Sequence, residues 1–340
     1  MIRLRPAALF AAVTLTAAVQ ACPICQGLGQ QKPCFAEQII AADSLVIARA
    51  TNRRTFKVEK ILRGDDAALG LPVEPPKAIF GTRILVAYRG KEETLLESVS
   101  PDLQGFVETV LSLKTFEPSV NSGWSKQLNV FLPYLGNRDL RVARSAWTAW
   151  AHAPYEVVRV QTLLPDPDLL QKWLADPDRA SEAALYWRLL GLQADDAIRS
   201  QLREKVMVNW NTNDARDLAA LLDAELSANG KNAVKFIRER YLDDRTRTLA
   251  EIQSALLALR LQGMKGDPSM RKPVALAFEN FVINRRPLAG LVASDLATWD
   301  RWNSGRTYSE IINSGEPVLP KSRPAILNYL KQCPEIDVKK

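Results

Sequence analysis

The amino-acid sequence predicts an α+β protein in which a small antiparallel β domain precedes an all-α region. Between residues 42 and 98, short apolar runs alternate with glycines, a pattern typical of short strands joined by turns. From residue 102 onward, apolar side chains recur at helical spacing with almost no strand pattern. The 340 residues suffice for about two domains. We assign residues 1–21 to a signal peptide, 22–100 to the cysteine-bearing β domain and 101–340 to the helical domain.

The first 21 residues have the features of an export signal. Arg3 and Arg5 give a positive start, and residues 7–19 form a mostly apolar run that is too short to span a bilayer comfortably. Residues 19–21 then place small or short side chains where a signal peptidase cleaves. We therefore expect an exported protein, either periplasmic or secreted.

The residues around this cleavage point also allow a membrane anchor. Residues 19–22 (VQAC) resemble a bacterial lipoprotein box, although Gln20 stands where a small residue is usual. The resemblance implies a lipid-modified Cys22. A membrane is therefore an expected partner only if Cys22 carries a lipid.

The chain has four cysteines, Cys22, Cys25, Cys34 and Cys333. Export implies an oxidising compartment, in which disulfides are expected, and four cysteines allow three connectivities. We favour a Cys25–Cys34 bridge, which closes a short loop, with Cys22–Cys34 as the alternative. Cys333 either ties the C-terminal tail to the N-terminus or stays free.

The spacing of the first two cysteines suggests two other chemistries. Cys22 and Cys25 resemble the C-x-x-C active site of thioredoxin-like oxidoreductases, which needs a preceding strand and a following helix. Together with Gly27 and Gly29 they also resemble the zinc-binding repeat of DnaJ chaperones, which needs two such copies where this chain has one. A metal-binding or thiol-redox protein is thus the alternative function. With His152 as the only histidine, we expect no His-based metal or triad site.

The β domain is expected to begin with a helix at residues 35–41. Alternation and β-branched content then predict strands at residues 44–50, 55–62, 71–73, 83–88 and 93–99. Several short strands at this spacing favour a small antiparallel barrel or sandwich.

Two of these strands carry a family resemblance. Residues 42–48 (ADSLVIA) and 56–64 (FKVEKILRG), after a cysteine-rich start and a helix, are similar to the netrin-like domain. That domain is the OB-type barrel of the tissue inhibitors of metalloproteinases, so the resemblance implies a closed barrel. In those inhibitors the N-terminal cysteine contacts a protease zinc, and Cys22 would take that place here. Several cysteines of the family have no counterpart in this chain, and a netrin-like protease inhibitor is our further alternative.

Residues 128–151 predict two helices joined by a polar turn. Pro133 should kink or end the first helix, and Asp139 should cap the second, with Asn137 as the alternative cap. The second helix has one apolar stripe, formed by Leu140, Ala143, Ala146, Trp147 and Trp150. One helix pair cannot bury such a stripe alone, so it must stack on a neighbour.

This second helix also resembles part of a known repeat. Asp139, Val142, Ala146 and Ala149 are placed as in the second helix of a HEAT repeat, although Ala143 stands where that family often has an arginine. The resemblance implies a HEAT-like helical array. We also see a similarity to uncharacterised bacterial exported proteins that join such an array to a small β domain.

Further helices follow along the rest of the chain. We predict them at residues 102–113, 154–164, 167–175, 180–192, 194–208, 214–228, 231–242, 246–262, 271–283, 294–303 and 321–331. Gly191, Gly230 and Gly263 are expected at helix ends. Six tryptophans lie on apolar helix faces, and we expect them to pack between helices, with an aromatic ligand groove as the alternative: Trp147, Trp150, Trp173, Trp187, Trp299 and Trp302.

The sequence predicts neither an enzyme nor a nucleic-acid-binding protein. It has no glycine-rich phosphate loop, nucleophile elbow or metal-spaced histidines, and capping explains the acidic pairs Asp166/Asp168 and Asp176/Asp178. The net charge of +7 falls to +5 when Arg3 and Arg5 are removed, and basic residues are interspersed with acidic ones. We therefore expect no catalytic residues and no cofactor, and predict an exported scaffold that binds protein partners in the cell envelope.

Overall fold

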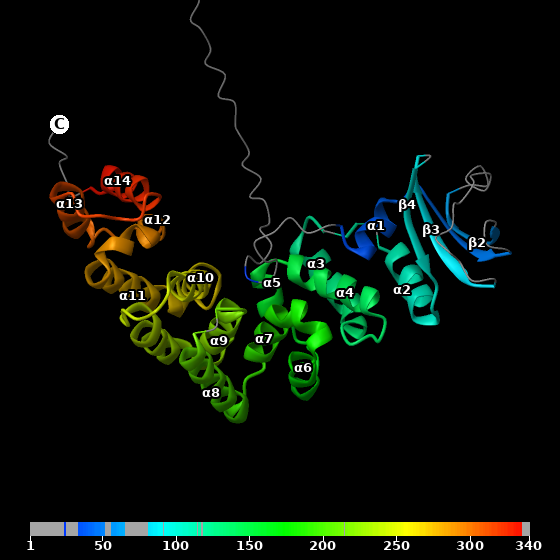
Figure 1. Ribbon diagram of the computed structural model, residues 1–340, viewed down its shortest axis with the longest axis horizontal. Coiled ribbons are helices and arrows are strands. Elements are labelled where there is room, and N and C mark those ends of the chain that lie inside the picture. The colour runs from blue at the N-terminus through cyan, green and yellow to red at the C-terminus, as the bar shows by residue number, and fades with distance from the viewer. Residues whose placement is uncertain are drawn as a thin grey trace, which may run out of the picture.

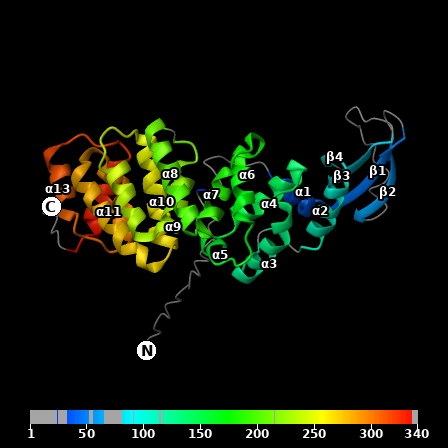
Figure 2. The ribbon, with the colours of Figure 1, turned by 90° about the horizontal axis from the view of Figure 1, so that it is seen from below.

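The computed structural model describes Ile24 and residues 33–51, 56–64, 81–90, 92–113, 115–116, 118–213 and 215–334. Over these residues the protein is α+β, with one four-stranded antiparallel sheet and a long row of helices. The sheet lies at one end of the molecule and α14 (Ser322–Gln332) near the other, and the row of helices between them is bent (Figure 1). Viewed from below, the same row looks straight (Figure 2). None of the described helices is both long and apolar enough to cross a membrane.

The sheet is open. Its strands are β1 (Ser44–Ala50), β2 (Phe56–Arg63), β3 (Arg83–Arg89) and β4 (Glu92–Ser98), in the spatial order β2-β1-β3-β4. Leu45 of β1 faces Arg63 of β2 on one side and Ala87 of β3 on the other. Among the described residues β2 and β4 stay at opposite edges without pairing. The predicted closed OB-type barrel is therefore wrong. Helices pack against one face of the sheet, whereas in a barrel the sheet would curve until its two edge strands paired.

Four of the five predicted strands are confirmed, and the fifth, at residues 71–73, lies outside the described residues. The central strands read as continuous apolar runs because both of their faces are buried. One face packs against α1 (Phe35–Ala41) and α2 (Pro101–Leu111) through Leu45, Ile47, Leu85 and Ala87. The other face forms a separate small cluster of Val46, Ala48, Ile84, Val86 and Tyr88.

One apolar core continues from the sheet through the helices to the far end of the chain. It includes Phe106 of α2, Leu222 of α9, Phe278 of α11 and Tyr329 of α14, each fully buried. The row is built by neighbouring contacts of α1 with α4, α4 with α7, α7 with α9, α9 with α10 and α10 with α11. On the outer side of the bend lie α6 and α8, and on its inner side α5 and α10 (Figure 1).

The remaining helices follow α2 in chain order. They are α3 (Asn121–Phe131), α4 (Leu140–His152), α5 (Tyr155–Arg159), α6 (Pro167–Leu174), α7 (Ala183–Leu192), α8 (Asp196–Thr212), α9 (Leu218–Ile237), α10 (Leu249–Lys265), α11 (Arg271–Asn284), α12 (Ala293–Thr298) and α13 (Gly305–Ser314). Short 3-10 or π turns link several of them.

Proline and glycine residues interrupt the helices largely as the sequence predicts. Pro133 falls in a 3-10 turn directly after α3, so it does end that helix. Gly230 has φ +56° and kinks α9 where two separate helices were expected. The helix predicted at residues 154–164 is shorter, ending at Arg159, and α13 was not predicted.

Asp139 caps α4 and joins the helices to the sheet. Its side chain accepts a hydrogen bond from the Arg141 amide at 3.1 Å, which confirms the predicted cap. The Arg141 guanidinium pairs with Asp139 at 2.6 Å and with Glu97 of β4 at 2.7 Å. Ser100, the cap of α2, also donates to Asp139 at 3.2 Å. The Arg141 guanidinium holds the pKa of Asp139 below its ordinary value.

We predict that Asp139→Ala lowers the free energy of unfolding at pH 6 by about 1–2 kcal/mol, as for other lost helix caps. Because the folded state depresses the pKa of Asp139, its contribution is present above the ordinary pKa of 3.8 and is lost as the pH falls through the folded value. Denaturant titrations of both proteins from pH 6 down to pH 3 should show the difference shrinking only below about pH 4. A difference that stays constant over this range would contradict the assigned role.

Candidate functional site

An open groove lies on the outer side of the bend, and we call it the α7–α8 groove. It consists of two adjoining sections with volumes of about 420 Å³ and 650 Å³. Both sections are lined by Leu174 of α6, Trp187 of α7, and Lys205 and Val208 of α8. Leu221, near the start of α9, closes the second section.

The apolar wall of the groove is formed by side chains that core packing does not fully bury. In α7, Leu185, Tyr186 and Leu189 are fully buried, whereas Trp187 is half-buried and lines the groove. In α8, Val206 is fully buried but Val208 is 52% exposed. The groove therefore offers an indole and an aliphatic side chain to solvent, side by side.

The charges of the groove are mixed. Lys205 and Arg216 carry positive charge, and Glu204 and Asp217 carry negative charge. Within the described parts of the chain, Lys205 forms no ion pair, so its ammonium is available to a carboxylate. The groove thus presents an apolar surface beside an exposed ammonium.

A buried polar cluster lies on the other side of α7 and α9, at the seam where they meet α5 and α10. Gln262 of α10 donates to Asp223 of α9 at 2.8 Å, to the Tyr155 hydroxyl at 2.6 Å and to Ser227 at 2.9 Å. Tyr155 itself donates to Asp223 at 3.1 Å. Arg188 of α7 lies 3.9 Å from the centre of the Tyr155 ring and donates to the Tyr155 carbonyl at 2.8 Å.

The polar groups of this cluster act as hydrogen-bond donors and acceptors. Burial first, and then the Asp223 carboxylate, raises the pKa of Tyr155 well above its ordinary value, so the phenol stays protonated. Arg188 and Asp223 are fully buried. Buried charges are retained where they are paired and hydrogen-bonded. No sequence spacing indicated this cluster, because its members come from four different helices.

The cysteines that the structure describes are free thiols. Cys34 is half-buried at the start of α1, where burial raises its pKa to about 12, and Cys333 is buried after α14. These positions are at opposite ends of the row (Figure 1). Cys34 and Cys333 are therefore not joined to each other, and the Cys25–Cys34 and Cys22–Cys34 bridges stay predictions. Cys22 and Cys25 themselves lie outside the described residues.

The zinc, redox and inhibitor alternatives all depend on Cys22. In the parts of the chain that the structure describes, no three His, Cys, Asp or Glu side chains gather closely enough to hold a metal ion.

The acidic pairs behave as predicted, since Asp166 and Asp176 accept from the backbone amides two residues ahead and so cap α6 and the turn before α7.

All six tryptophans pack in or against the core as predicted, and Trp187 also lines the groove. Trp150 is fully buried, Trp147 is 7% exposed, and the other four are half-buried. Trp173, Trp299 and Trp302 contact Tyr186, Phe278 and Tyr329. The sequence could not single out Trp187, because all six lie on apolar helix faces.

No family model, curated protein or solved structure matches this chain. The netrin-like and HEAT-like resemblances of its segments therefore stay predictions, and the functional argument depends on the site geometry.

Proposed function

We propose that this protein is an exported, non-enzymatic scaffold that binds protein partners in the cell envelope through a HEAT-like helical array. The observation that carries the proposal is the α7–α8 groove, where Trp187 and the 52% exposed Val208 lie beside Lys205. Helical-repeat arrays commonly bind other proteins. The apolar leader with Arg3 and Arg5 supports export.

The groove defines the chemistry of the partner. An aromatic or aliphatic side chain of the partner would cover Trp187 and Val208, since tryptophan is the residue most often found at the energetic centre of an interface. A carboxylate beside that side chain would pair with Lys205. We therefore propose a partner segment that carries an apolar residue next to an acidic one.

A substitution at the rim tests this assignment. We expect Val208→Asp to abolish capture of a specific partner from envelope extract, because it places a charge in the apolar part of the groove. The control is Val160→Asp, since Val160 is 61% exposed and does not line the groove, and it should capture the partner as the wild type does. A photoreactive residue in place of Glu204, which lines the groove, should cross-link to the same partner.

Two outcomes would count against the proposal. One is a partner that Val208→Asp and wild type retain equally, which would place the contact elsewhere on the array. The other is the absence of any partner that cross-links from position 204, with circular dichroism showing intact helices.

A further inference from the structure

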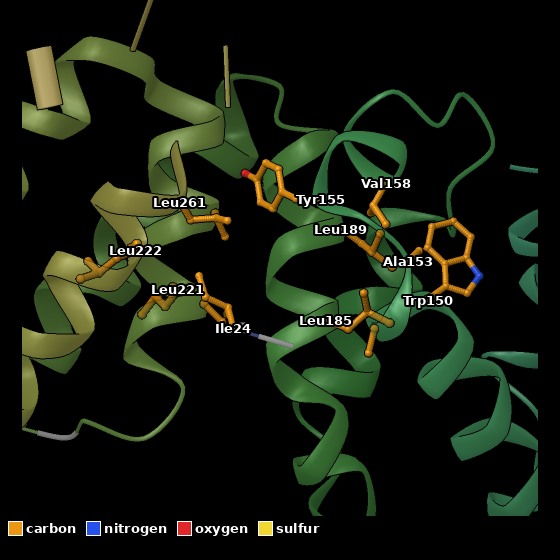
Figure 3. Close-up of a cluster of buried hydrophobic side chains, with 14 of the residues drawn as sticks. Ile24, Trp150, Ala153, Tyr155, Val158, Leu185, Leu189, Leu221, Leu222 and Leu261 are labelled. Carbon is orange, nitrogen blue, oxygen red and sulfur yellow. The ribbon is translucent and has the colours of Figure 1, made fainter. Parts of the chain in front are cut away.

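Ile24 precedes α1 in sequence, but it lies in the middle of the helical row, near α7 and α9 (Figure 3). It is 8% exposed and belongs to the same apolar core as the helices. Figure 3 shows its side chain between Leu221 of α9 and Leu185 of α7, with Leu261 and Tyr155 farther along the seam. An aliphatic residue from the N-terminal part of the chain is thus inserted between two helices that follow it by more than 150 positions in sequence.

The surroundings of Ile24 form a well-defined seat. Leu185 and Leu189 are fully buried, and Leu221 and Leu261 are 5% and 6% exposed. Aliphatic side chains on both helices thus enclose an aliphatic guest. Leu221 also lines the α7–α8 groove, so the seat and the groove share this side chain.

The polar cluster adjoins this seat through Tyr155. The ring of Tyr155 belongs to the apolar core, while its hydroxyl bonds to Asp223 and Gln262. A peptide that inserts an aliphatic side chain also brings its backbone amides and carbonyls, which must be hydrogen-bonded when buried. Gln262, Asp223 and Arg188 place polar groups next to the apolar seat, where they already hydrogen-bond within the cluster.

We propose that the seam between α7 and α9 is a binding site for a peptide with an aliphatic side chain, and that the segment of this chain around Ile24 is its resident ligand. This proposal goes beyond the scaffold function and does not depend on the α7–α8 groove. Its occupant is covalently attached, so it competes with any free peptide at a high effective concentration, on the order of millimolar.

The test uses the full-length protein and a fluorescent peptide of residues 22–33 with serine in place of both cysteines. Wild type should bind the peptide weakly, because its own segment occupies the seat. Ile24→Asp should empty the seat, lower the melting temperature and bind the peptide at least about tenfold more tightly than wild type does. A second peptide with aspartate in place of Ile24 should not bind either protein.

Matched variants keep the outcome interpretable. Ile24→Val should behave as wild type, and Val160→Asp, the same change at an exposed position, should leave both the melting temperature and peptide binding unchanged. If Ile24→Asp does not fold, Ile24→Ala replaces it with the same expected direction.

Three results would overturn the proposal. Equal binding of the peptide to wild type and Ile24→Asp would show that the seam is not the site. A folded Ile24→Asp protein that binds no peptide would show that Ile24 only fills space in the core. Tighter binding of a peptide of residues 333–340, which carries Ile336 and Val338, would assign the seam to the other end of the chain.

Discussion

The Trp147→Ala protein is expected to lose about 3–5 kcal/mol of its free energy of unfolding, the range for a large aromatic side chain removed from a core. Trp147 is 7% exposed on α4, at its contact with α7. Its indole Nε1 donates to the carbonyl of Glu182 at 3.1 Å, directly before α7 begins. The alanine variant therefore leaves a cavity between two helices and a buried carbonyl without its donor.

A second substitution separates these two effects. Trp147→Phe keeps most of the apolar volume but removes the hydrogen bond, and it should lose about 1–3 kcal/mol, the penalty of an unsatisfied buried group. Leu169→Ala is the control, because Leu169 is 40% exposed and should change stability by less than about 0.5 kcal/mol. All four proteins can be compared by urea titration followed by circular dichroism. A loss below about 1 kcal/mol for Trp147→Ala would place the indole outside the core.

The secondary structure was largely predictable because helical and alternating periodicities are local signals. The helix at residues 35–41 and the strand at 44–50 match the structure residue for residue. Closure of the sheet was not predictable in this way, since it depends on whether β2 and β4 meet in space. The helix α13 was missed because it is short and begins with Gly305, although Tyr308 and Ile311 lie on one face three positions apart and are buried.

The candidate sites were less predictable than the fold. Tyr155, Asp223 and Gln262 come from three helices, and each one alone is compatible with an ordinary helix surface. Only the packing of α5, α9 and α10 brings them within hydrogen-bonding distance. Ile24 is an aliphatic residue between Cys22 and Cys25, and nothing in its local sequence indicates which helices it packs against.

Gly191 shows how one residue type can serve two physical purposes. The sequence predicted a helix-end glycine, yet Gly191 lies within α7 and has no positive φ. A β-carbon at this position would lie 2.6 Å from the Cα and 2.7 Å from the carbonyl oxygen of Ala224 in α9. Because both of these are backbone atoms, no rotamer change can relieve the overlap, and the two helices would have to separate.

We therefore predict that Gly191→Asn destabilises the protein by about 3 kcal/mol or more, the upper part of the range for overpacking a core. Gly315 is the matched comparison, since it ends α13 in the left-handed region with φ +70° and has open space around its Cα. Asparagine is tolerated at left-handed helix ends, so Gly315→Asn should lose less than about 1 kcal/mol. If the two asparagine variants melted at the same temperature, conformational freedom would explain both glycines. If only Gly191→Asn lowers the melting temperature, the close approach of α7 to α9 is what requires glycine. The same variant should then also weaken the seat that holds Ile24.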